Sequence, residues 1–458
     1  MKAAPPGHVL EGRQAPSANR QIFNAAALIA VLTFVVKLAA MGKEMVGAAF
    51  FGTGDAMDAF VMALLLPSYV INVVAGSFNA ALIPIQIETR ERLGPPAARR
   101  LFRSVSILGC VSLLLIMLLL AAASPFLLPV LCSGFGPEKL ALASRLFYLL
   151  LPIIALCGMI TQWEALLNAS ERFAMAAFAP AALSLVTLGM LWWKGGRWGI
   201  YAMVAGTLVG LVFQLVLLGF AAKRLGLAGA LLPWWHGMEP NVRRVIGQYL
   251  PMIAGSVLFC SSILVDQTMA GMLAAGSVAT LNYGNKLVAL AVGIGTTALG
   301  TAVLPHFSRM TANRDWPGVR HTLKTYTWII LLVTVPATAV AIWGSTPLAT
   351  LLYERGNFTR EDTLAVSWVQ QMFFLQIPFY SLSLLYVRMI SSLKGNRIVM
   401  AGAFAGFCLN VGLNLCLMKP MGVAGIALST SFVYLFMTLA MGGMLWRKLA
   451  QVEKGGDE

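Results

Sequence analysis

The segment VVKLAAMGKEMVGAAFFGTGDAMDAF, residues 35–60, combines a long apolar run with charges that membrane helices rarely carry. Lys37, Lys43 and Glu44 lie inside the run, and Asp58 follows a glycine-containing turn. A charged side chain at the centre of a bilayer costs roughly 2.5–3.5 kcal/mol on insertion scales, and such residues usually face a bundle interior or a wet cavity. The segment therefore predicts a membrane helix with one polar side turned away from lipid.

The rest of the chain has the composition of a polytopic membrane protein. Of its 458 residues, 59% are hydrophobic and 11% are charged, whereas a soluble domain has about 25% charged residues. Mean hydropathy is +0.79, and apolar runs long enough to span a bilayer recur along the whole length. They predict an all-α fold with about twelve transmembrane helices, near residues 24–50, 58–84, 105–130, 142–167, 174–193, 199–221, 246–274, 282–304, 325–345, 369–387, 398–418 and 422–446.

The basic residues predict the orientation of these spans. If the N-terminus is cytoplasmic, the tails and even-numbered loops hold 23 of the 33 Lys and Arg, the odd-numbered loops hold 6 and the spans hold 4. Cytoplasmic loops of membrane proteins carry such an excess, so both termini are predicted to be cytoplasmic. The net charge of +15 is then a topology signal, and we expect no nucleic-acid partner.

Similar motifs recur at a nearly constant spacing of 221 to 225 residues, which indicates an internal repeat. The interval contains six predicted spans, an even number, so both halves enter the membrane in the same direction. Transporters built from parallel halves bind substrate between them near the midplane; duplicated halves that pack rigidly are the alternative. The matched pairs are Gly54 with Gly276, Pro84 with Pro305, Pro125 with Pro347 and Arg172 with Arg397.

The repeat predicts two parallel six-helix lobes around a central cavity. Residues 22–222 form the N-terminal lobe and residues 246–446 the C-terminal lobe, joined by a cytoplasmic linker at 223–245. The tails, 1–21 and 447–458, are predicted to be cytoplasmic.

Three lysines in these lobes form a candidate anion site. Lys37 and Glu44 are seven residues apart and share a helix face, and Lys43 lies about 120° round from Lys37. Lys286, in LNYGNKLVAL, adds a cation from the second half. Converging lysines would bind a compact polyanion such as a diphosphate. The alternative is structural pairing of Lys37 with Glu44 and of Lys43 with Asp58; the two interpretations are compatible if the acids hold the lysines when no substrate is bound.

A second polar set lies wholly in the second half. Asp266, Asn410, Asn414 and Thr430 offer one carboxylate and several neutral oxygens, which suit a weak Na⁺ or H⁺ site. Hydrogen bonding between helices is the alternative interpretation. The sequence assigns no other cofactor and no firm metal site.

Catalytic motifs are not found. The four histidines fall in the predicted tail or loops, and HExxH, GxSxG and phosphate-loop patterns are absent from the sequence. We expect a transporter that is not an enzyme.

Three stretches resemble the MurJ/MviN lipid II flippases of the multidrug/oligosaccharidyl-lipid/polysaccharide exporter superfamily. FFGTGDAMDAFVMALLLPSYVINVVAGSFNAALIP (50–84) is similar to their first-to-second-span signature, and LNYGNKLVALAVGIGTTALGTAVLPHFSR (281–309) to their span-eight signature. LLYERGNFTREDT (351–363) resembles the loop after their span nine. The similarity runs in matching order over residues 22–446, nearly the whole chain.

The resemblance implies a cavity lined by cationic side chains that bind the diphosphate of an undecaprenyl-linked sugar. By position these are Lys37, Lys43 and Lys286, and the associated acids, which would hold or gate them, are Glu44 and Asp58. The family usually has arginine at some or all of the basic positions. Lysine keeps the charge but loses the bidentate guanidinium fork.

Other positions depart from the family pattern. Ile71 and Asn72 replace a basic pair, Ala75 replaces a glutamate, and the chain stops after the twelfth span, whereas family members usually carry two more helices. These departures leave the sugar open.

The sequence therefore predicts a flippase in the bacterial cytoplasmic (inner) membrane, which moves an undecaprenyl-diphosphate-linked sugar to the outer leaflet by alternating access, for peptidoglycan biosynthesis in the cell wall. Another lipid-linked oligosaccharide, for an exopolysaccharide or O-antigen, is the alternative substrate. A drug or cation antiporter of the same superfamily is a further alternative. Membrane lipid and the substrate are the expected partners, and the protein is expected to act as a monomer.

Overall fold

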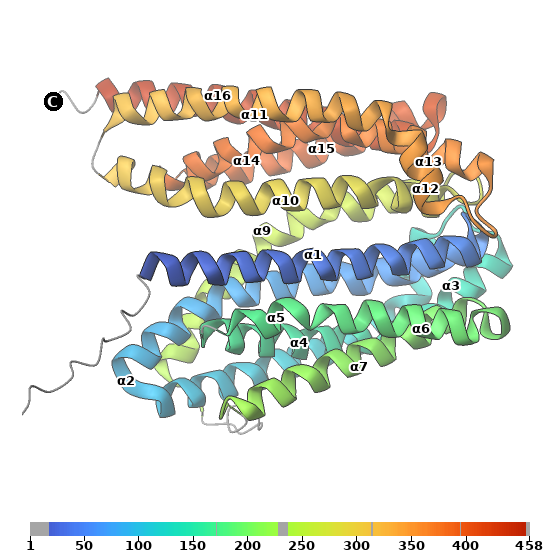
Figure 1. Ribbon diagram of the computed structural model, residues 1–458, viewed down its shortest axis with the longest axis horizontal. Coiled ribbons are helices and arrows are strands. Elements are labelled where there is room, and N and C mark those ends of the chain that lie inside the picture. Colours follow the sequence, from blue (N-terminus) through green and yellow to red (C-terminus); the bar gives the residue numbers. More distant parts are fainter. Residues whose placement is uncertain (1–17, 171, 228–236, 313–314, 394, 455–458) are drawn as a thin grey trace, which may run out of the picture.

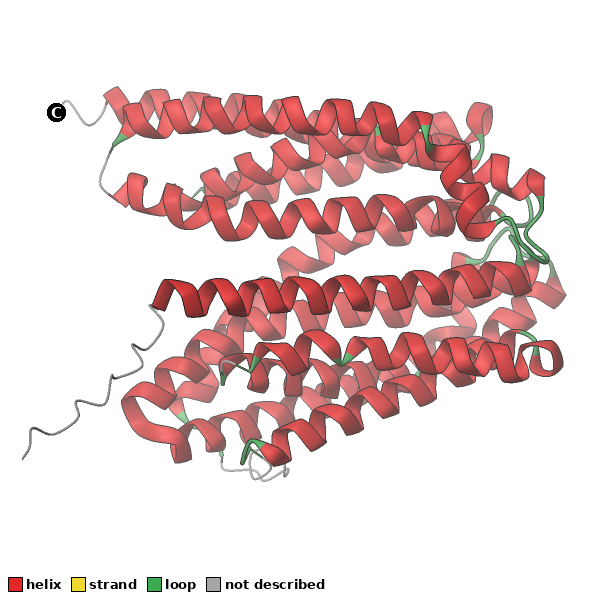
Figure 2. Cartoon of the chain, in the orientation of Figure 1, coloured by secondary structure: helices red, strands yellow, loops and turns green. Residues whose placement is uncertain are grey.

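The computed structural model describes residues 18–454 except 171, 228–236, 313–314 and 394. Every regular element in that part is an α-helix (Figure 2). Eight helical stretches are long and apolar enough to cross a membrane. Nine of the twelve predicted spans fall within these stretches, because one stretch, Asp55–Leu131, holds two, and helices over the remaining three complete the predicted set. The prediction of an all-helical membrane fold is confirmed.

The first half of the chain contains seven helices within the described residues. Four of them form two pairs, α3 with α4 and α5 with α6, and the helices of each pair follow each other so closely that the pair forms one span. The helices are α1 (Ala18–Phe51), α2 (Asp55–Leu131), α3 (Pro137–Leu150), α4 (Pro152–Ala169), α5 (Phe173–Phe178), α6 (Pro180–Trp198) and α7 (Ile200–Arg224).

The second half repeats the order of spans, but the part that corresponds to α2 is divided into three helices, α10, α11 and α12. The helices are α9 (Pro240–Gly271), α10 (Ser277–Ala312), α11 (Trp316–Trp343), α12 (Ser345–Tyr353), α13 (Arg360–Phe374), α14 (Gln376–Ser392), α15 (Asn396–Met421) and α16 (Val423–Lys454). Here α13 and α14 together form one span.

Proline and glycine account for the main interruptions. Pro152 and Pro180 begin α4 and α6, because proline has no N–H to continue a preceding helix but suits the first turn. Residues 85–104 look like a polar loop in the sequence, yet α2 runs through them and bends only at Gly94, whose φ of 82° lies in the left-handed region. The turn between spans two and three is therefore a helical hairpin.

The helices form two bundles side by side, and α9 crosses between them (Figure 1). α1, α2 and α4–α7 pack as one lobe, and α10, α11 and α13–α16 as the other. α9 contacts α15 and α16 in the second lobe but also packs along α2 in the first. The first described residue of α1 and the C-terminal end of α16 lie at the same end of the molecule, here called the termini end; the opposite end is the far end.

At the far end the lobes touch through reciprocal glycine contacts. A Cβ on Gly134 would clash with the backbone of Gly271, and a Cβ on Gly356 would clash with the backbone of Ala49. The contacts are equivalent in the repeat, because 356 minus 134 and 271 minus 49 both give 222. The two halves therefore meet about a pseudo-twofold axis, as the sequence repeat predicts.

Candidate functional site

Three charged side chains from both lobes meet at one carboxylate oxygen. Oε1 of Glu44 lies 3.0 Å from Nζ of Lys43 and 3.1 Å from Nζ of Lys286. Lys43 and Glu44 belong to α1, whereas Lys286 belongs to α10 in the other lobe. We call Lys43, Glu44 and Lys286 the charged triad. Glu44 thus bridges the lobes by holding both lysines.

The triad lines a cavity of about 430 Å³ between the lobes. The side chain of Lys286 is 36% exposed and that of Lys43 is 21% exposed, but that of Glu44 is only 9% exposed. The ammonium groups are therefore accessible from the cavity while the carboxylate lies behind them. With two cations and one anion, the site carries a net charge of +1 and suits an anionic ligand.

Lys37 does not join the triad. Its side chain is exposed, it does not line the 430 Å³ cavity, and within the described residues it has no ion-pair partner. It precedes Lys43 by six residues, which places it about 9 Å nearer the termini end along α1. The predicted pairing of Lys37 with Glu44 is wrong in this structure, because Lys43 and Lys286 take both positions at the carboxylate.

Asp58 also has other partners than predicted. Its side chain is buried and accepts hydrogen bonds from Nζ of Lys139 at 2.6 Å and from the backbone N–H groups of Gly276 and Ala279 at 2.8 and 2.7 Å. The predicted pairing with Lys43 is wrong. Asp58 instead binds the first turn of α10, where a helix has free N–H groups and a positive dipole end.

These contacts make Asp58 part of a far-end latch between the lobes. On the other side of the latch, Asn357 donates from its backbone N–H to the carbonyl of Ala49 at 2.8 Å and from its side chain to the carbonyl of Phe50 at 2.6 Å. The hydroxyl of Thr53 donates to Asp362. The lobes are therefore joined by polar contacts on both sides of the pseudo-twofold axis.

The four residues predicted to form a cation site do lie together. Oδ1 of Asp266 accepts from the side-chain amides of Asn410 at 3.1 Å and Asn414 at 2.7 Å, and Oδ2 accepts from Thr430 at 3.3 Å. A further hydroxyl, that of Ser429, donates to Asn414. These contacts join α9 to α15 and α16 within one lobe. The amide nitrogens face Asp266, so these contacts are the hydrogen bonds between helices that the sequence offers as the alternative interpretation.

A family model described as Lipid II flippase MurJ matches residues 47–456. The chain belongs to the lipid II flippase MurJ family. A probable lipid II flippase MurJ from Synechocystis is 26% identical over 454 residues, covering 96% of this chain and 84% of that protein. Another probable lipid II flippase MurJ, from Helicobacter pylori, is 27% identical over 415 residues, covering 84% of this chain and 87% of that protein.

Solved structures share the fold. A lipid II flippase MurJ in an inward closed conformation gives a TM-score of 0.77 at 20% identity, covering 93% of this chain and 90% of that one. An inward-facing multidrug resistance MATE transporter gives a TM-score of 0.78 at 11% identity, covering 92% of this chain and 99% of that one. An outward-facing MATE transporter gives a TM-score of 0.59, covering 92% of this chain and 96% of that one. The fold of this MurJ family member is therefore shared by both groups of transporters.

Some residues of this site in the MurJ family member are not predicted by the sequence. Lys139, which holds Asp58, is in the sequence an ordinary basic residue of a predicted loop. Gln267 lines the triad's cavity, as does Asn282 from the polar stretch that contains Lys286. The signal for Gln267 was its place beside Asp266 in a membrane helix, and Asn282 stands four residues before Lys286. For Lys139 no local signal existed, because its partner lies 81 residues away.

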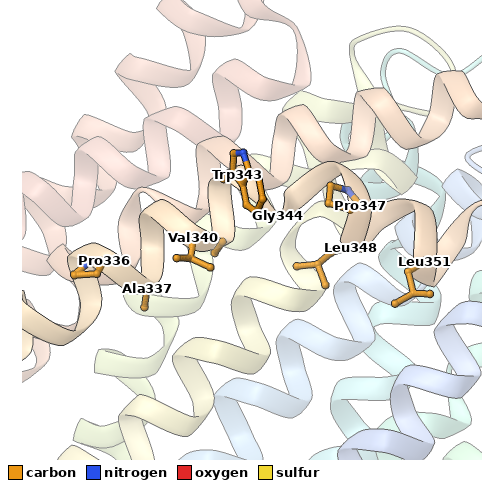
Figure 3. A pocket seen from close by; sticks show the side chains of 9 residues that line it. Pro336, Ala337, Val340, Trp343, Gly344, Pro347, Leu348 and Leu351 are labelled. Atoms are coloured by element: carbon orange, nitrogen blue, oxygen red, sulfur yellow. The ribbon is translucent and has the colours of Figure 1, made fainter.

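A larger groove of about 730 Å³ lies where α11 meets α12 (Figure 3). Its walls are apolar, and Trp343 at its edge is 86% exposed. An exposed tryptophan at a helix end is typical of a membrane interface. The groove has no group that could bind a diphosphate, so the smaller, charged cavity is the candidate substrate site of this MurJ family member.

Ion pairs at the termini end fasten α9 to the first lobe. Arg244 of α9 donates to Glu88 of α2 at 3.1 Å, and Arg100 of α2 lies 3.5 Å from Glu239 at the start of α9. The hydrogen bond from Arg244 holds the pKa of Glu88 below its usual range. This half of α9 is therefore held by the first lobe, whereas Asp266 attaches the other half to the second.

Proposed function

We propose that this chain is a flippase that carries an undecaprenyl-diphosphate-linked sugar, such as lipid II, across the membrane by alternating access. Membership of the MurJ family supports the substrate class. The observation that carries the proposal is the charged triad, in which Lys43 and Lys286 come from different lobes and share Glu44. A site made by both lobes changes its geometry whenever the lobes rock.

Glu44 acts in this proposal as a stand-in for the substrate phosphate. Without substrate it neutralises part of the charge of both lysines. A diphosphate offers several strong acceptors to Lys43 and Lys286 and displaces the carboxylate from them. When the lobes rock apart at the far end, Lys286 moves relative to Lys43 and the diphosphate loses one of its two ligands. Glu44 then recovers its lysines when the lobes return.

Lys37 is proposed to meet the diphosphate first. It is exposed and unpaired within the described residues, and it lies about 9 Å nearer the termini end than Lys43. We propose that the termini end faces the cytoplasm and that the membrane is the bacterial inner membrane. The headgroup would then pass from Lys37 to the triad along one face of α1.

Asp266 is proposed to hold a coupling Na⁺ or H⁺. A cation would take the carboxylate together with the side-chain oxygens of Asn410, Asn414 and Thr430. Both amide nitrogens now point at Asp266, so cation binding requires the amides to turn over. The cation supplies positive charge at α9, and these residues hold it.

The cavity's charge favours this proposal over a cation antiporter. Its charged residues are two lysines and one glutamate, so a cationic drug would meet net repulsion. Lipid II and other undecaprenyl-diphosphate oligosaccharides share the diphosphate that the lysines would bind. Which sugar is carried therefore depends on contacts beyond the triad, and both substrates belong in the test.

The test is a flipping assay in proteoliposomes with fluorescent lipid II and, separately, with an undecaprenyl-diphosphate oligosaccharide. Hydrogen bonds to charged groups are each worth roughly 1.5–3 kcal/mol, so Lys43→Ala and Lys286→Ala should each lower the flipping rate by about ten- to a hundredfold. Lys194→Ala is the control, because Lys194 packs on the exposed Trp193 and does not line the cavity.

Two outcomes would contradict the proposal. Unchanged flipping in Lys43→Ala and Lys286→Ala, at normal folded yield, removes the phosphate role of the triad. Failure of the unmodified protein to flip either lipid removes the flippase function. Complementation of a bacterium depleted of its lipid II flippase separates the two sugars, since only lipid II transport restores growth.

A further inference from the structure

Two tyrosine hydroxyls are buried without hydrogen-bond partners behind the charged triad. Tyr283 of α10 is 1% exposed and Tyr353 at the end of α12 is 0% exposed, and neither hydroxyl has a partner among the described residues. Their ring centroids are 5.2 Å apart, and each lies 5.6 Å from the ring of Phe358. Buried hydroxyls normally have a partner, and an ordered water often supplies it.

The tyrosines lie near two pockets, each of which has a carboxylate in its wall. Glu44 faces the central cavity. Asp362, with Thr53 and Glu361, lines a separate pocket of about 370 Å³ at the far end. On α10, Tyr283 lies three residues from Thr280, which lines the far-end pocket, and three residues from Lys286, which lines the central cavity. Tyr283 and the ring of Tyr353 packed on it therefore lie between the two pockets.

The distance between the two carboxylates is short. Asp362 accepts from Thr53, which follows Glu44 by nine residues. At 1.5 Å per helical residue, the two acids are separated by about 13 Å along the axis of α1. Hydrogen-bonded oxygens are about 2.8 Å apart, so two hydroxyls and two or three waters are enough to span that depth.

We propose that the Tyr283 and Tyr353 hydroxyls, together with water held between them, carry protons between the far-end pocket at Asp362 and Glu44. Each hydroxyl accepts a proton from the neighbour on one side and gives its own to the neighbour on the other. Both tyrosines end unchanged, and the Glu44 carboxylate becomes a carboxylic acid. The path works while the lobes are closed to the substrate at the far end.

The effect of this proton on substrate binding rests on the proposed function of the triad. The charged groups that face Glu44 are Lys43 on its own helix and Lys286 on α10, with Tyr283 and Tyr353 from α10 and α12. A proton on Glu44 removes the anion that holds the lysines, and the charge of the triad rises from +1 to +2. Acid on the far-end side would therefore prepare the triad for a diphosphate.

Infrared difference spectroscopy of oriented proteoliposomes tests the path without any substrate. The pH is stepped on the far-end side alone, and the carboxylic-acid band that Glu44→Gln removes reports the protonation of Glu44. We expect the double variant with Tyr283→Phe and Tyr353→Phe to lower the rate at which this band appears at least tenfold. Tyr386→Phe is the control, because Tyr386 is a buried tyrosine of the same lobe whose hydroxyl lies 3.4 Å from Thr327.

An unchanged rate in the double variant would overturn the proposal, and so would a band that follows only the pH of the termini side. A thermal melt provides a second measurement. If water is hydrogen-bonded to the hydroxyls, each Tyr→Phe change removes hydrogen bonds and lowers the melting temperature. If no water is present between the tyrosines, each change leaves the melting temperature equal or higher. The second result would also overturn the proposal. Neither measurement uses flipping, so failure here leaves the flippase proposal standing.

Discussion

The far-end latch should open when Asp58 loses its charge. In Asp58→Asn, the amide keeps the shape of the side chain but offers one neutral acceptor oxygen in place of two charged ones. The bond to Lys139 lies within the first lobe and persists when the lobes separate, so it does not affect the balance between the two conformations. The bonds to Gly276 and Ala279 cross between lobes and exist only in the closed arrangement.

The size of the effect follows from those two bonds. Hydrogen bonds to charged groups contribute roughly 1.5–3 kcal/mol each, and the dipole of the α10 N-terminus adds about 0.3–1 kcal/mol. Asparagine retains about half of this sum, so we expect the closed arrangement to lose about 2–3 kcal/mol of stability relative to the open one. Each 1.4 kcal/mol changes an equilibrium tenfold. The fraction of molecules open at the far end should therefore rise by about 30- to 150-fold relative to the closed fraction.

Pulsed electron paramagnetic resonance measures this ratio directly. Spin labels at the exposed Glu138 and Arg355 report the distance between the lobes, after the six native cysteines are replaced. Asp55→Asn is the matched control, because Asp55 is 62% exposed and pairs with Lys139 within the first lobe. If Asp58→Asn folds normally and its distance distribution matches that of the unmodified protein, the latch does not set the conformational balance.

Three further predictions follow from single contacts. Gly276→Ala should open the far end, because Gly276 has a φ of 85° and an added Cβ would clash with the carbonyl of Thr53. We expect the closed arrangement to lose about 1 kcal/mol or more of stability. The same spin-label distance measurement checks this, and an unchanged distance distribution would contradict it. The depressed pKa of Glu88 stabilises the fold above the unfolded pKa of this carboxyl, and that stability is lost as the pH falls through the folded pKa. Lowering the pH through this range should therefore weaken the attachment of α9. Glu88→Gln should reduce the accompanying fall in melting temperature, and an undiminished fall would assign the pH dependence to other groups. Asp266→Asn should abolish any dependence of flipping on Na⁺ while leaving diphosphate binding intact, and equal Na⁺ dependence in both proteins would exclude Asp266 as the Na⁺ ligand.

The spans were predictable because a bilayer imposes a simple requirement. An apolar run of about 20 residues has few alternatives to a membrane helix. The interruptions were harder to predict: Gly94 looks like the centre of a polar loop, yet it only bends α2. The polar residues around it remain helical because a helix satisfies its own backbone in water as well as in lipid.

The membership of the site was easier to predict than its pairings. Lys43, Glu44 and Lys286 stood out because charge is rare at bilayer depth, and Asp266 stood out for the same reason. The partner of each acid depends on how α10 and α3 are placed against α1 and α2, which hydropathy does not encode. Local spacing favoured Lys37 for Glu44, whereas the structure uses Lys286 from 242 residues away. Lys139 was missed because a lysine in a loop is ordinary until its carboxylate is known.

The repeat relates the two acids that the sequence treats as separate sites. Glu44 and Asp266 are 222 positions apart (266 minus 44), the same offset that relates the two glycine contacts at the far end. One position of the ancestral half thus carries an acid in both lobes, with opposite surroundings. Lysines hold Glu44, one of them from across the interface, whereas amides and a hydroxyl of its own lobe hold Asp266. Rocking the lobes must break a contact of Glu44 but can leave every contact of Asp266 intact. With the roles that we propose, the duplicated acid responds to the position of the lobes in one half and to a cation in the other, which gives a symmetric fold the asymmetry that directional transport requires.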